Sequence, residues 1–218
     1  MIIRVKYTKT DILKYLSHLD MVRLMERAFR RAEIDLHYTQ GFHPIAKMSF
    51  SPPVALGIES YGELLEADLN CSSFDSNDFI DKLNTSLPIG CRILDAVKID
   101  KEEGRMSKRR LKADYEILFD NLACDEIVIS IQKAMDNDSC IITKINKSGK
   151  KVQTDIRNKI FYLDAYENSD QKAIMRCVLD STQNSILSPV SLLNYLKENC
   201  YLQIDENYKI TKTDMVIS

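Results

Sequence analysis

Two kinds of short apolar pattern alternate along this chain, and their order constrains the fold more than any single residue does. Apolar and polar residues alternate over residues 3–7, with the period of two of a half-buried β-strand. Further strands are predicted at residues 34–39, 47–51 and 91–99, and residues 64–69 extend or replace the strand at 47–51. Helical patterns occupy residues 18–33 and 79–87. The first hundred residues therefore predict the order strand, helix, strand, strand, helix, strand.

The first predicted helix carries the clearest signals. Ser17 and Asp20 have the spacing of a capping box at its start. Its apolar positions recur every three or four residues and are Leu19, Val22, Met25, Phe29 and Ala32. This stripe is expected to face a sheet.

The order is repeated more loosely after a basic connector at residues 101–112. Strands are predicted at residues 115–119, 140–145, 160–165, 174–179 and 208–217. Helices are predicted at residues 125–135 and from Ser188, where Pro189 suits the first turn, and a turn is predicted at residues 147–151. We predict an α+β protein with two tandem ferredoxin-like (βαββαβ) units and antiparallel sheets, at residues 1–100 and 113–218.

Composition limits the possible partners. The formal net charge of the 218 residues is −2, so any nucleic-acid surface must be a local patch. No apolar run approaches the roughly 20 residues that cross a bilayer, and we expect a cytoplasmic protein with no membrane partner. The six cysteines show no CxxC spacing, which predicts reduced thiols with structural roles, no metal site and no cofactor.

One loop in the first half concentrates unusual side chains. An amide, an aromatic ring, an imidazole and an ammonium group occur within eight residues, at Gln40, Phe42, His43 and Lys47. This mixture suits recognition of a polar, planar or anionic ligand. The alternative is a well-packed loop in which Gly41 supplies a positive φ angle. His18 similarly either hydrogen-bonds locally or acts as an acid, a base or an RNA contact.

Charged residues supply further candidates. The polar side of the first helix, which begins near Asp20, carries four arginines that would favour anions unless they form a solvated face: Arg23, Arg27, Arg30 and Arg31. The connector adds Arg105, Lys108, Arg109, Arg110 and Lys112, which together with the helix would hold phosphates. Asp155 and Arg157 would point to the same side of a strand, either in a salt bridge between the halves or in contact with a phosphate or partner.

Together these motifs resemble the radical SAM-linked, uncharacterised bacterial protein family. The resemblance rests on Tyr-Leu-Ser-His-Leu-Asp at residues 15–20, the arginine-rich helix, and the motifs at residues 38–44, 47–50, 52–53, 57–60 and 155–157. The sequence departs from the family pattern at two places. The family often has a further histidine, a proline and a basic residue after His-Pro, whereas Ile45 and Ala46 stand before Lys47 here. Asn158 stands where a proline commonly follows Asp-Ile-Arg. The first departure argues against a metal site in the loop.

The resemblance implies a radical S-adenosylmethionine protein as partner, encoded separately or fused in relatives. This chain lacks the CxxxCxxC triad that would hold the cluster. We therefore predict a non-catalytic recognition or accessory module that works with such an enzyme on RNA or a ribosomal component. The alternatives are a metal-independent ribonuclease of duplicated ferredoxin-like fold that uses His18 or His43, and a protein-only scaffold.

Overall fold

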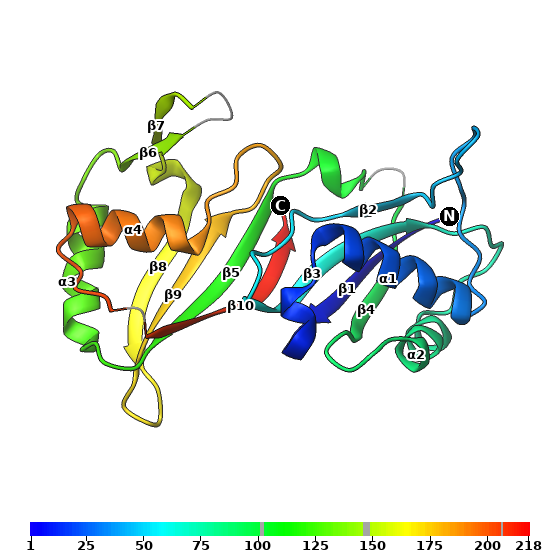
Figure 1. Cartoon of the computed structure of the whole chain (residues 1–218), viewed down its shortest axis with the longest axis horizontal. Coiled ribbons are helices and arrows are strands. Elements are labelled where there is room, and N and C mark those ends of the chain that lie inside the picture. The colour runs from blue at the N-terminus through cyan, green and yellow to red at the C-terminus, as the bar shows by residue number, and fades with distance from the viewer. Residues whose placement is uncertain (101–102, 146–148, 206) are drawn as a thin grey trace. The chain divides into compact units, whose positions relative to one another are not determined.

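The computed structural model describes residues 1–100, 103–145, 149–205 and 207–218, and it has a mixed α+β architecture. Four α-helices and a largely antiparallel set of strands are present among these residues (Figure 1). The chain forms two compact units. The first unit comprises Met1–Arg110 and Lys212–Ser218, and the second comprises Leu111–Thr211.

The first unit contains the predicted order of elements. Its elements are β1 (Ile2–Lys9), a 3₁₀ turn η1 (Asp11–Tyr15), α1 (His18–Arg31), β2 (Met48–Phe50), β3 (Glu59–Asp68), α2 (Ser76–Ser86), β4 (Ile93–Lys98) and the 3₁₀ turn η2 (Met106–Lys108). The strands run in the order β4, β1, β3, with β2 beside β3, and all three pairings are antiparallel. The predicted strand at residues 34–39 is reduced to two isolated bridges, Leu36 with Leu69 and Tyr38 with Ala46.

Helix α1 begins where the capping signal places it. The Ser17 Oγ accepts a hydrogen bond from the Asp20 backbone N–H at 3.2 Å. The buried stripe, however, consists of Met21, Met25, Ala28 and Phe29. Leu19 is 66% exposed, because at about 100° per residue it lies roughly 120° around the helix axis from Met25. The prediction that Leu19 faces the sheet was therefore wrong.

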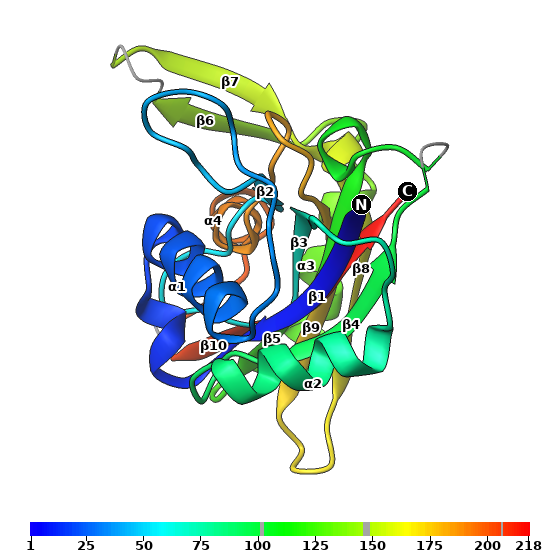
Figure 2. The same cartoon turned by 90° about the vertical axis from the view of Figure 1, so that its right-hand side faces the viewer.

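Both helices of the first unit cover the same face of its sheet (Figure 2). The α1 stripe packs with Ile3 and Val5 of β1 and Leu65 of β3. From α2, Phe79 contacts Phe29 with ring centroids 6.0 Å apart. Burial of such apolar side chains supplies most of the stabilisation of this unit.

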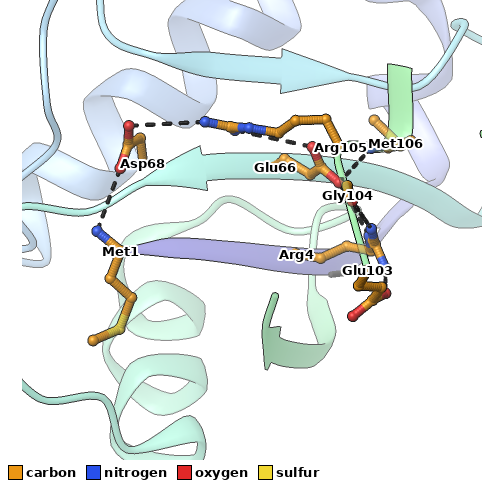
Figure 3. A network of polar contacts seen from close by, with 8 residues as sticks. All are labelled: Met1, Arg4, Glu66, Asp68, Glu103, Gly104, Arg105 and Met106. Atoms are coloured by element: carbon orange, nitrogen blue, oxygen red, sulfur yellow. Dashed lines mark hydrogen bonds and ion pairs between the residues drawn. The ribbon is translucent and has the colours of Figure 1, made fainter. Parts of the chain in front are cut away.

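The other face of the sheet holds a polar network that ties the connector to it (Figure 3). The Oε1 atom of the buried Glu66 accepts hydrogen bonds from Arg4 Nε at 3.2 Å, Arg4 Nη2 at 3.0 Å and the Met106 backbone N–H at 2.8 Å. Glu103 pairs with Arg4. Part of the predicted connector therefore belongs to the first unit.

Arg105 and the amino terminus extend this network (Figure 3). Arg105 Nη1 lies 4.0 Å from Glu66 Oε2, and its Nη2 lies 3.9 Å from Asp68 Oδ2. The Met1 ammonium group lies 3.4 Å from Asp68 Oδ1. Two residues of the predicted connector, 101–102, lie outside the described residues, and its last two begin the next strand.

The second unit repeats the alternation of strands and helices with an added hairpin. Its elements are β5 (Leu111–Phe119), α3 (Cys124–Met135), β6 (Ile141–Ile145), β7 (Lys151–Asp155), the 3₁₀ turn η3 (Arg157–Lys159), β8 (Ile160–Glu167), β9 (Ala173–Asp180), α4 (Pro189–Asn199) and the start of β10 (Tyr208–Ile217). Strands β5, β9 and β8 pair antiparallel in that order. Strand β10 lies next to β5 in the sheet. Just beyond the ends of these two strands, the Asp120 backbone N–H donates to the Asn207 carbonyl.

The start of α4 is confirmed, because Ser188 Oγ accepts from the Ser191 backbone N–H and Pro189 is the first helical residue. Strand β7 was missed, since its residues are mostly exposed and show no apolar alternation. The predicted turn at residues 147–151 lies partly outside the described residues. No helix in the described ranges is long and apolar enough to span a membrane.

Candidate anion-binding groove

A groove of about 420 Å³ runs beside α1 in the first unit. Its lining residues are Leu16, Asp20, Arg23, Leu24, Arg27, Arg31, Ser86 and Pro88. The arginines come from α1, and Ser86 and Pro88 come from the end of α2 and the residues after it. The groove thus combines an apolar lining with guanidinium groups.

Helical geometry selects the arginines that line the groove. Arg23, Arg27 and Arg31 are four residues apart, so successive members are displaced by about 6 Å along the axis and only about 40° around it. Arg30 lies outside the groove, and its Nη2 is 3.5 Å from Glu26 Oε1. Of the four arginines predicted on the polar side of this helix, all but Arg30 line the groove.

The groove carries an excess of positive charge. Arg23 Nη1 lies 3.3 Å from Asp20 Oδ1, while Asp20 also accepts a hydrogen bond from Ser17 Oγ at 2.7 Å. Arg27 and Arg31 make no ion pair within the described part of the chain. Three arginines against one aspartate leave a formal charge of +2 in the lining. Two unpaired guanidinium groups suit a phosphate or another oxyanion.

The predicted recognition loop does not join this groove. Gln40, Phe42, His43 and Lys47 are all exposed, and none of them lines the groove. Their loop is instead closed on itself, because Thr39 and Ile45 exchange two hydrogen bonds. The backbone of Lys47 is bonded to His37 and Asp68, which fixes it beside β3.

The structure does not unite the two candidate histidines. His18 stands at the start of α1, with its ring 5.6 Å from that of Phe50 in an edge-to-face arrangement. Phe50 ends β2, whereas His43 lies in the loop that precedes β2. Along the chain, His43 precedes Phe50, whose ring lies beside that of His18, by seven residues. The described residues show no contact between the two histidine rings.

Asp155 and Arg157 form a corner of the second unit. Asp155 ends β7, and its Oδ1 atom accepts hydrogen bonds from the Arg157 and Cys140 backbone N–H groups, both at 2.9 Å. These two bonds lower the pKa of Asp155. Arg157 starts η3 and donates to the Met135 carbonyl at 3.5 Å. The prediction that both residues lie on one strand was wrong, because the chain turns at the buried Ile156.

Replacing Asp155 by alanine is expected to destabilise the second unit by roughly 1 kcal/mol, as removal of a capping side chain does. Asp155→Asn keeps an acceptor oxygen and should cost less. Folding lowers the pKa of Asp155, so the ionised carboxylate stabilises the folded state. The extra stability of the aspartate protein over the asparagine variant is therefore present above the ordinary pKa near 3.8, and it is lost as the pH falls through the folded pKa. Urea unfolding at neutral and acidic pH measures this difference, and equal destabilisation by both variants at neutral pH would contradict it.

The first unit contains a buried ionic cluster that no sequence pattern predicted. Lys212 is completely buried, and its Nζ lies 2.7 Å from Glu63 Oε1. Ser60 Oγ donates to the same oxygen at 2.7 Å. Lys9 donates to the Leu16 carbonyl at 2.9 Å, and burial lowers its pKa while Glu63 opposes that shift. Through Lys9, the end of β1 is bonded to the segment between η1 and α1.

The fold and the groove define an α+β protein with a basic, helix-lined surface recess. Residues 3–189 match the model of a family described as uncharacterized protein conserved in bacteria (DUF2344). The chain belongs to this family, since the match covers most of its length. A comparison with curated proteins found no match.

Proposed function

We propose that this chain is a non-catalytic module that recognises RNA and presents it to a radical SAM protein. The carrying observation is the pair of unpaired arginines, Arg27 and Arg31, in the groove beside α1. Guanidinium groups bind phosphate oxygens through two parallel hydrogen bonds, and much of the affinity of nucleic-acid complexes comes from such contacts.

The dimensions favour a single strand over a duplex. A recess of about 420 Å³ has the size of a site for a small molecule, and a double helix is far too wide to enter it. The three arginines follow one line along α1, so a single backbone would meet them in succession. The apolar side chains of Leu16, Leu24 and Pro88 would lie against the sugars or bases.

The radical SAM partnership rests on the resemblance of the sequence motifs. The chain contributes no CxxxCxxC triad, so the cluster would come from the partner. The alternative proposal is a metal-independent ribonuclease that uses His18 or His43.

We also infer that each unit is ferredoxin-like. The order β4, β1, β3, β2 with antiparallel pairings supports this assignment in the first unit. In the second unit, β5, β9 and β8 take the corresponding places, with β10 beside β5 and the β6–β7 hairpin as an insertion. Two helices accompany each set of strands, as in the βαββαβ arrangement.

The triple variant Arg23→Gln, Arg27→Gln, Arg31→Gln tests the groove. A uniform single-stranded oligouridine is the probe, and its affinity is measured at several salt concentrations. The slope of log affinity against log salt is expected to shrink by about 0.7 for each phosphate that the variant no longer binds, or about 2 for all three. The melting temperature should change little, since surface substitutions stay within about ±0.5 kcal/mol.

Arg30→Gln is the matched control, because Arg30 belongs to the same helix but lies outside the groove. It should leave the salt slope almost unchanged. Equal effects of Arg30→Gln and of each groove substitution would indicate non-specific attraction to the whole helix. Unchanged affinity in the triple variant would overturn the RNA proposal and favour the protein-only scaffold.

A further inference from the structure

Residues 38–46 form a finger whose base is fixed in the core of the first unit. Tyr38 and Ala46 face each other in an antiparallel bridge, and Ala46 belongs to the buried core cluster. Above this bridge, the Thr39 backbone N–H donates to the Ile45 carbonyl at 2.9 Å, and the Ile45 N–H donates to Thr39 Oγ1 at 3.0 Å. The tip at residues 40–44 is therefore presented on an ordered base.

The finger exposes apolar side chains without covering them. Phe42 at its tip is fully exposed, Ile45 is 66% exposed and Tyr38 is 40% exposed. Burial of the Phe42 ring against a partner would remove this apolar surface from water and so favour the complex. Several large apolar side chains gathered on one projection are typical of a binding surface rather than of scattered surface residues.

The finger also contains no lysine, arginine, aspartate or glutamate in nine residues. At the chain's overall 28% of charged residues, about two or three would be expected. Aromatic enrichment together with charge depletion characterises the centre of protein–protein interfaces. A surface for single-stranded RNA would instead combine stacking rings with cations that follow the backbone.

We propose that residues 38–46 are a docking finger that inserts Phe42 into an apolar, uncharged pocket of a folded partner protein. The match of charge is the basis for this class of partner, because the finger offers an RNA backbone no cation. The ordered base lowers the conformational entropy lost on binding. Phe42 is the anchor of the contact, and Tyr38 and Ile45 add exposed apolar surface on the same finger.

A photocrosslinking amino acid placed at position 42 of the full chain, in the bacterium that makes it, tests the finger. The expected result is one discrete adduct that is sensitive to protease and resistant to ribonuclease. Excess unlabelled wild-type chain should reduce this adduct at least tenfold, and excess Phe42→Ser chain should not. The same crosslinker at Ile129, a solvent-accessible apolar position on α3, should form no such adduct.

Three outcomes would overturn the docking finger: a ribonuclease-sensitive adduct, no adduct at position 42, or equal competition by the wild-type and Phe42→Ser chains. Combining the crosslinker with the three groove substitutions separates this proposal from the RNA proposal. The protein adduct at position 42 should persist in that combination, because the finger and the groove share no lining residue.

Discussion

Lys212→Met is expected to lower the free energy of unfolding by about 3 kcal/mol, at the lower end of the range for breaking a buried ion pair. The substitution leaves the buried Glu63 carboxylate with the Ser60 hydroxyl but without its ammonium partner at 2.7 Å. Lys9 also interacts electrostatically with Glu63, which limits the destabilisation. Urea denaturation followed by far-UV circular dichroism measures the change, since the chain has no tryptophan.

The double variant Glu63→Gln with Lys212→Met should be less destabilised than Lys212→Met alone. It removes the uncompensated charge, and buried pairs replaced on both sides are often close to neutral. Lys82→Met is the exposed control, because Lys82 pairs with Asp78 at 2.7 Å on the surface and should contribute less than about 1 kcal/mol. A double variant as unstable as the single one would show that poorer packing, and not the buried charge, dominates.

Gly62→Ala is expected to cost about 3 kcal/mol or more, at or beyond the upper range for overpacking a core. A Cβ atom at this position would lie 2.5 Å from Asp214 Cα and 2.7 Å from Met215 N. Backbone atoms cannot rotate away, so the end of β10 would have to move. That movement would also disturb the Lys212–Glu63 and Lys6–Asp214 ion pairs.

Gly104→Ala is the control that distinguishes the effect of a steric clash at position 62 from the effect of backbone strain. Gly104 has a φ of +73° and nothing within 4 Å of its virtual Cβ, so its substitution tests conformation alone and should cost about 1 kcal/mol. Thermal unfolding of both variants gives the comparison. If Gly62→Ala proved no worse than Gly104→Ala, the approach of β10 to β3 would be looser than described.

The sequence by itself determined the elements whose signals are local. The Ser17 cap of α1, the Ser188 and Pro189 start of α4, and the strand at Tyr208–Ile217 were all predicted at the right residues. Caps depend on atoms three residues apart, and strand alternation depends on neighbours two residues apart. Such information is contained in a short window of sequence.

Only the tertiary structure decided which polar residues act together. Lys212 and Glu63 are 149 residues apart, and no periodicity connects them. Helical spacing aligns Arg23, Arg27 and Arg31, but the groove that they line exists because the end of α2 lies beside α1. These arrangements follow from strand pairing and helix packing between distant segments, and a local pattern of side chains carries no record of them.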